Sequence, residues 1–191
     1  MVVIDPGPDV EDHVRVLASR METAERATIL LTHGHRDHAG AAATLARVTG
    51  APVLGPEGLD AYGVEDVDTI VRDGDRIETD VGTLRAVHTP GHTPEHLCFV
   101  WEEERALFAG DLVLGEGDTT WVAEYPGCVA EYLDSMERVR GLDLDVVYPA
   151  HGPELVDPPA VWDRFEGHRR DRIEQVRVAL STSCLLYTSP S

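Results

Sequence analysis

A histidine-rich loop constrains this chain more than any other part of its sequence. The loop follows a short apolar run, residues 27–31, which has the length and branching of a buried β-strand. It precedes residues 41–48, which favour a helix that ends at Gly50. Within six positions the loop carries three imidazoles and a carboxylate, on His33, His35, Asp37 and His38. These groups are typical ligands of zinc, iron and similar divalent ions, so the loop predicts a metal site at a strand end.

The spacing within the loop favours two ions over one. His33 and His35 lie two positions apart, so an extended segment points both the same way. Asp37 and His38 come after a turn and can face a second position. The alternative is an ordinary polar surface loop with scattered histidines, and further ligand-type residues downstream weigh against it.

Three more ligand-type side chains follow apolar runs later in the chain. His92, Asp111 and His151 each come after a predicted strand, and each has a glycine beside it. Two packed sheets with their strand ends gathered at one edge would bring these side chains together with the first loop. The predicted helices between the strands indicate outer helical layers, so the predicted fold class is α+β.

Apolar periodicity predicts three further helices. The first has one apolar stripe, formed by Val10, Val14, Leu17 and Met21, with His13 expected in solvent. The second spans residues 129–140. The last begins at Pro158, and its predicted apolar stripe is Phe165, Ile173, Val176 and Leu180. Short strands are predicted at residues 2–4, 52–54, 76–78, 83–87, 97–101, 106–108 and 143–148.

Composition narrows the choice of partners and compartment. The chain has 191 residues and a formal net charge of −19. This charge argues against non-specific binding to nucleic acid, which requires clustered positive charge. No apolar run approaches the roughly 20 residues of a membrane span, and no basic-then-apolar leader opens the sequence. Three cysteines without a C-x-x-C spacing fit a reducing compartment, so we expect a cytoplasmic protein that does not bind a membrane.

The order and type of the ligand candidates resemble the metallo-β-lactamase superfamily, the αββα metallohydrolases. Residues 32–38 are similar to the H-x-H-x-D-H motif of that family, and residues 89–93 to its third-ligand motif. Residues 110–111 resemble its bridging aspartate, and residues 150–152 its last histidine. The resemblance covers most of residues 2–155 and implies an αββα sandwich.

The resemblance also implies a role for each ligand candidate. One zinc ion would be held by His33, His35 and His92, and a second by Asp37, His38 and His151. Asp111 would bridge them, and two ions ~3.5–4 Å apart lower the pKa of a shared water toward ~7. The resulting hydroxide would attack a carbonyl or phosphorus, with Asp37 as the predicted catalytic residue that steers the water or accepts its proton. His88 and His96 are candidates for a supporting or substrate-facing role, with plain packing as the alternative.

Within the superfamily, the chain most resembles the lactamase-beta-2-like branch, which includes an endoribonuclease. Residues 88–96, residues 110–117 and the helix that contains His168 carry this resemblance. Proteins of that branch start with earlier strands and continue into a winged-helix domain, so this chain looks truncated and the sandwich incomplete at its N-terminal edge. We expect three parts: a metallo-β-lactamase-like domain at 1–156, a C-terminal helix at 157–182 and a poorly packed, non-native tail at 183–191.

Three functions remain open. The first is a dinuclear zinc hydrolase. Its substrate would be a small ester, lactone or β-lactam, a thioester as in glyoxalase II-like thioesterases, or the phosphodiester bond of single-stranded RNA. The second is a mononuclear iron oxygenase of the persulfide dioxygenase type, although a complete second ligand set weighs against it. The third is an inactive fragment with an exposed sheet edge. The basic residues of the last helix are expected to form a solvated face, with contact to an anionic substrate as the alternative: His168, Arg169, Arg170 and Arg172.

Overall fold

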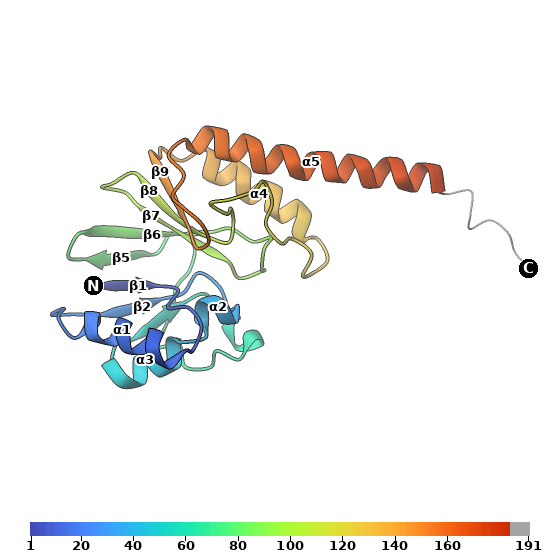
Figure 1. Ribbon diagram of the computed structural model, residues 1–191. Coiled ribbons are helices and arrows are strands. Elements are labelled where there is room, and N and C mark those ends of the chain that lie inside the picture. Colours follow the sequence, from blue (N-terminus) through green and yellow to red (C-terminus); the bar gives the residue numbers. More distant parts are fainter. Residues whose placement is uncertain (184–191) are drawn as a thin grey trace, which may run out of the picture.

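Two β-sheets lie face to face between helical layers in the computed structural model, which describes residues 1–183 (Figure 1). Sheet A is parallel and contains, in spatial order, β1 (Val2–Ile4), β2 (Thr28–Leu30), β3 (Val53–Gly55) and β4 (Thr69–Ile70). Sheet B contains β5 (Arg76–Thr79), β6 (Gly82–His88), β7 (Leu97–Trp101), β8 (Ala106–Gly110) and β9 (Val146–Pro149). The predicted αββα sandwich is confirmed, while its incompleteness at the N-terminal edge stays a prediction.

Helices cover the outer face of each sheet. The helices beside sheet A are α1 (Glu11–Met21) and α3 (Ala42–Thr49), and those beside sheet B are α4 (Cys128–Arg140) and α5 (Pro158–Ser183) (Figure 1). Two short elements lie in the loops of the first half, α2 (Arg36–Ala39) and the 3-10 helix η1 (Leu59–Tyr62). Within the described residues, no helix is long and apolar enough to cross a membrane.

The core forms three layers, one between the sheets and one under each helical layer. Strand β7 shows why a central strand is apolar on both faces. Leu97 and Phe99 pack in the layer between the sheets, while Cys98 and Val100 alternate with them and pack in the layer under α4. Cys98 is therefore fully buried as a small apolar residue on this face of β7.

Strand direction places several loops at one edge of sheet B. Strand β7 is antiparallel to β6 and to β8, and β9 is parallel to β8, so β6, β8 and β9 all run the same way. Their carboxyl ends therefore meet at one edge, and the loops that carry His92, Asp111 and His151 follow from those ends. Sheet topology thus fulfils the expectation that the ligand-type residues gather.

The last predicted strand and the last predicted helical stripe differ from the structure. Strand β9 begins at Val146 rather than at residue 143, because Asp143 and Asp145 form ion pairs with Arg105 in the β7–β8 turn. In the predicted stripe of α5, Phe165 is buried, but Leu180 is 67% exposed. Ile173 and Val176 are also exposed, because α5 extends past α4 and the sheet that its first turns cover (Figure 1).

Two more sequence predictions, the stripe of α1 and the set of short elements, differ from the structure, and the predicted exposure of His13 is confirmed. Val10 precedes α1 and is exposed rather than part of its buried stripe. The short elements α2, η1 and β4 were not predicted, because elements of two to four residues carry little periodicity. His13 is exposed as expected, with its Nε2 2.7 Å from the carbonyl oxygen of Pro6.

Residues 184–191, most of the predicted tail, lie outside the described residues. The predicted division into domain, helix and tail therefore stays a prediction.

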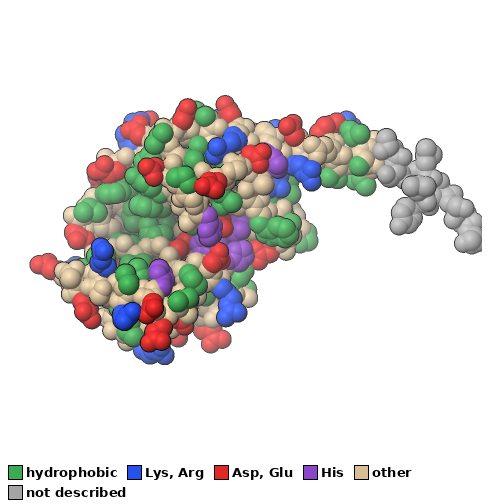
Figure 2. Space-filling view, in the orientation of Figure 1, with side chains coloured by type: hydrophobic (Ala, Val, Ile, Leu, Met, Phe, Trp, Pro, Cys, Tyr) green, Lys and Arg blue, Asp and Glu red, His purple; other side chains and the backbone are tan. Residues whose placement is uncertain are grey.

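A groove opens beside β1, which is an edge strand of sheet A. It has a volume of about 580 Å³ against the inner face of sheet B, where Figure 2 shows a hollow lined by hydrophobic side chains. On this face Trp101 stacks on Phe108, and Phe108 on Tyr148. At its far end the groove reaches His38 and His151. The groove therefore joins an apolar surface to the predicted metal ligands.

The two halves of α5 should respond differently to truncation of an apolar side chain. Trp162 is 2% exposed and lies in the core layer under α4, so Trp162→Ala should lower the free energy of unfolding by about 3–5 kcal/mol. Leu180→Ala should change it by less than about 0.5 kcal/mol, because that side chain is exposed. Urea denaturation followed by circular dichroism measures both, and equal losses would contradict this account of α5.

Candidate metal centre

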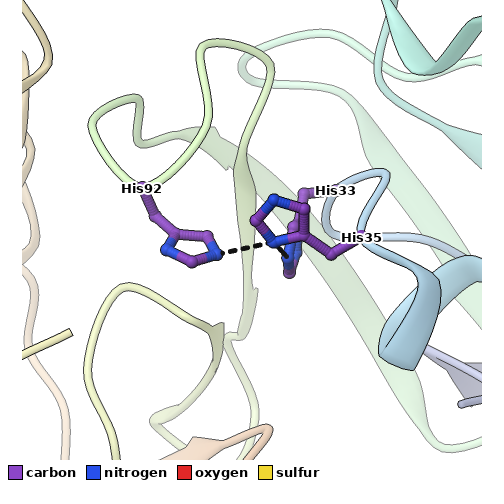
Figure 3. A group of neighbouring side chains, drawn as sticks. All are labelled: His33, His35 and His92. Atoms are coloured by element: carbon purple, nitrogen blue, oxygen red, sulfur yellow. Dashed lines mark hydrogen bonds between the residues drawn. The ribbon is translucent and has the colours of Figure 1, made fainter. Parts of the chain in front are cut away.

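Three imidazoles converge beyond the end of β2. His33 and His35 lie on the segment that follows this strand, and His92 lies on the loop after β6 (Figure 3). Nδ1 of His35 is 3.1 Å from Nε2 of His33 and 3.0 Å from Nε2 of His92. Nitrogen ligands ~2.0–2.1 Å from one tetrahedral cation lie roughly 3.3 Å from one another, so the spacing of these three atoms suits a single ion.

A second group lies beside the first. It consists of Asp37 and His38 on α2 and His151 after β9. Nε2 of His151 is 3.2 Å from Nε2 of His38 and 3.3 Å from Oδ2 of Asp37. The His38 side chain is buried, whereas those of Asp37 and His151 are 59% and 47% exposed. The second group therefore faces solvent, from which a substrate can approach.

Asp111 connects the two groups. Its Oδ2 is 3.5 Å from Nε2 of His92 in the first group. Its Oδ1 is 3.5 Å from Nε2 of His38 and 3.6 Å from Nε2 of His151 in the second. One carboxylate oxygen thus faces each group, which is the arrangement expected of a bridging ligand. All seven predicted ligands are gathered at one place, although their binding of metal stays a prediction.

The chemistry of this site fits divalent cations. Within residues 1–183, Oδ1 of Asp111 is buried without a hydrogen-bond partner, which is costly for a carboxylate unless a cation lies beside it. Burial and neighbouring imidazoles lower the pKa of His33, and burial also lowers the pKa of His92. Both rings are therefore neutral at neutral pH, as coordination requires. Neutral imidazoles with carboxylates form a donor set that suits zinc or iron.

The carboxylates favour positive charge at the second group. Burial alone would lower the pKa of His38, but the interactions of its ring with Asp111 and Asp5 raise that pKa to about 10. Burial likewise opposes ionisation of Asp111, but the contact with His38 lowers the pKa of Asp111 below its usual value. A divalent cation at this place would satisfy the same carboxylates.

Two glycines allow the close approach of the site loops. A Cβ on Gly34, between the first two histidines, would lie 2.4 Å from the ring of Tyr62. Gly110 has a φ of +50°, and a Cβ there would lie 2.7 Å from Nε2 of His96. Only glycine fits such positions without displacing neighbouring groups.

Asp5 supports both groups and was missed in the sequence analysis. Its Oδ2 accepts hydrogen bonds from Nδ1 of His38 at 2.9 Å and from Oγ1 of Thr32 at 2.6 Å. Nδ1 of His33 is 2.9 Å from the same Thr32 oxygen, so Asp5 also supports His33 through Thr32. These bonds leave Nε2 of both histidines free to coordinate. The available signal was the position of Asp5 directly after an apolar strand, which it shares with the ligand-type residues.

The two flanking histidines lie in different surroundings. His96 is fully buried, and its Nε2 accepts a hydrogen bond from the backbone N–H of Asp111 at 3.1 Å. Its Nδ1 is 2.9 Å from Oγ1 of Thr89, and burial lowers the pKa of His96 well below its usual value. His96 therefore holds the backbone of Asp111. By contrast, Nε2 of His88 lies 2.9 Å from the carbonyl oxygen of Pro94, outside the ligand group.

Two facing sheets lie between helical layers (Figure 1), and Figure 2 shows histidine side chains clustered beside acidic ones. This fold with imidazoles and carboxylates gathered at the strand ends defines the αββα class of metallohydrolase folds. Within this class, the chain belongs to the metallo-beta-lactamase superfamily, whose family model matches residues 2–151.

Solved structures share this fold. A metallo-beta-lactamase family protein from Thermus thermophilus superposes with a TM-score of 0.76 at 22% identity, over 93% of this chain and 73% of that one. The protein TTHA1623, solved in a di-iron-bound form, superposes with a TM-score of 0.65 at 28% identity, over 86% of this chain and 87% of that one.

Curated relatives are longer than this chain. Lactamase-like protein aptB of Emericella nidulans is 36% identical over 187 residues, which cover 95% of this chain and 57% of aptB. An atrochrysone carboxyl ACP thioesterase of Aspergillus fumigatus is 31% identical, over 95% of this chain and 42% of that protein. The chain thus spans about half the length of these relatives.

Asp5→Asn should weaken metal binding at both groups. The amide cannot accept all the hydrogen bonds that Asp5 accepts, so the rings of His33 and His38 should lose their fixed orientation. We expect the affinity for zinc to fall about 10–100-fold, as for other supporting residues of metal sites. Competition with a chromophoric chelator measures it. Asp9→Asn is the matched control, because exposed Asp9 contacts Thr44 rather than the site, and an equal loss in both variants would contradict the role of Asp5.

Proposed function

We propose that this chain is a hydrolase that uses two divalent cations, in our interpretation zinc, to cleave a thioester or related ester bond. The observation that carries the proposal is the position of Asp111, whose two carboxylate oxygens face two separate groups of ligand-type side chains. A mononuclear iron oxygenase needs no second group, so the presence of Asp37 and His151 beside His38 disfavours that alternative.

Different groups at the site would perform different parts of the hydrolysis. Cations held at the two groups would lower the pKa of a bound water and polarise the substrate carbonyl. Asp37 is exposed at the open side of the site, where its carboxylate can orient an incoming water or accept its proton. Asp111 remains ionised at neutral pH, because the contact with His38 lowers its pKa despite burial. Its negative charge therefore balances positive charge between the groups.

A thioester is the favoured substrate class for two reasons. A protein 31% identical to this chain bears the name atrochrysone carboxyl ACP thioesterase. A net charge of −19 disfavours the single-stranded RNA substrate that the lactamase-beta-2-like, endoribonuclease-like resemblance would imply. The same donor set also suits iron, and the similar protein TTHA1623 was solved in a di-iron-bound form. We also propose a cytoplasmic location and a small-molecule ester or thioester as the substrate.

Asp37→Ala should reduce hydrolysis without removing the fold. On a thioester substrate we expect kcat/KM of the zinc-loaded protein to fall about 10²–10⁴-fold, the usual contribution of a positioned proton acceptor. Asp134→Ala, which removes an exposed carboxylate on α4, should leave kcat/KM unchanged. A spectrophotometric assay of thiol release measures both variants.

A substrate panel separates the rival functions. The zinc-loaded protein should cleave the thioester faster than a lactone, a β-lactam or single-stranded RNA, and a chelator should abolish this activity. Preferential cleavage of RNA would favour the endoribonuclease-like interpretation. One iron per chain together with uptake of oxygen would overturn the hydrolase proposal.

A further inference from the structure

Seven residues between β8 and α4 lie between the first group of histidines and α5. This segment, Asp118–Glu124, is called here the arch loop. The sequence predicted no metal-supporting role for it, yet it contacts three of the seven predicted ligands. Oγ1 of Thr120 donates a hydrogen bond to the carbonyl oxygen of Asp111 at 2.8 Å. The carbonyl oxygen of Trp121 accepts a hydrogen bond from Nδ1 of His92 at 2.8 Å.

The third contact involves His35, which presents a different ring nitrogen from its neighbours. His33 and His92 turn Nε2 toward the cation position, whereas His35 turns Nδ1 toward it. Its outer nitrogen is therefore Nε2, which lies 3.5 Å from Oε2 of Glu124 in the arch loop. Coordination through Nδ1 requires the proton on Nε2, and a carboxylate on that side favours this tautomer.

Tyr62 fixes the carboxylate that faces His35. The Tyr62 hydroxyl donates a hydrogen bond to Oε1 of Glu124 at 2.9 Å, which leaves Oε2 for the imidazole. The Tyr62 ring also contacts the His35 ring edge to face, with centroids 5.6 Å apart. His35 is thus held from one side by the arch loop and from another by η1.

Arg169 of α5 holds the arch loop from outside. Its Nη2 donates a hydrogen bond to the carbonyl oxygen of Thr120 at 2.9 Å, and its guanidinium lies over the ring of buried Tyr132. One residue earlier on α5, Nδ1 of His168 lies 3.1 Å from Oδ2 of Asp118. Arg169 and His168 therefore do not belong to the freely solvated basic face that the sequence suggested.

We propose that Glu124 and Arg169 are positioning residues for the first cation site. Glu124 selects the tautomer and orientation of His35, and Arg169 fixes the arch loop that carries Glu124 and the carbonyl partner of His92. The proposal rests on the two-cation site of the proposed function. It adds that α5, which carries none of the seven predicted ligands, contributes to metal affinity.

Metal titration of single variants tests the proposal. Zinc is titrated into the metal-free protein in competition with a chromophoric chelator. Glu124→Ala should weaken one of two sites about 10–100-fold, while Glu124→Gln should retain more affinity because its amide oxygen can still accept a hydrogen bond from the Nε2–H of His35. Arg169→Met should weaken the same site. Arg172→Met is the matched control, because Arg172 on the same helix donates to Gln175 and not to the arch loop.

Three further measurements separate positioning from a general structural role. With Co²⁺ in place of zinc, the visible absorption of the bound ion should change in Glu124→Ala and not in Arg172→Met. The double variant Glu124→Ala/Arg169→Met should lose less affinity than the two single losses combined, because part of the Arg169 effect passes through Glu124 while the rest acts through the carbonyl partner of His92. Melting of the metal-free proteins should show Glu124→Ala close to the unaltered protein.

The outcomes distinguish this inference from the proposed function. If the unaltered protein binds no more than one cation, the two-cation proposal fails. If it binds two and Glu124→Ala binds both with unchanged affinity, the positioning role is wrong while the hydrolase proposal stands. Equal losses in Arg169→Met and Arg172→Met would refute the role of Arg169.

Discussion

Hydrogen bonds on the outer nitrogens of the imidazoles are the interactions on which this site depends. A free imidazole can rotate and can carry its proton on either nitrogen, so an unsupported ring need not present a lone pair to a cation. Here His33 is fixed by Thr32, and His92 by the carbonyl oxygen of Trp121. The supporting groups come from distant parts of the chain. The ligands are therefore oriented only when the whole sandwich has formed.

Sheet topology brings those distant parts together. Strands β6, β8 and β9 run in one direction, so three of the four ligand-bearing loops leave sheet B at the same edge. The fourth loop leaves parallel sheet A at the end of β2, beside Asp5 at the end of β1. The apolar layer between the sheets, which includes Leu30 and Phe99, fixes the distance between these edges. The packing of the core thus determines the geometry of the polar site.

The ligands could be predicted from the sequence because each follows an apolar strand within a few residues. Their supporting groups could not, since Glu124 and His35 are 89 residues apart and no local pattern links them. Asp5 also lies at a strand end, but that end is separate from the four loops that carry the predicted ligands. The prediction of a long buried stripe on α5 was wrong for a related reason. An apolar periodicity indicates a face that can be buried, but it does not indicate whether a partner reaches as far as Leu180.

The charges at the site favour cations, while the protein as a whole is strongly negative. The carboxylates of Asp5 and Asp111 approach His38 from two sides and raise its pKa to about 10. The same field favours divalent cations, whose charge the carboxylates then offset. Beyond the site, a net charge of −19 repels a polyanionic chain such as RNA, while the carbonyl of an ester or thioester carries no net charge. In the proposed function, the field of the whole protein would therefore not oppose the approach of an uncharged reacting group to Asp37 and His151.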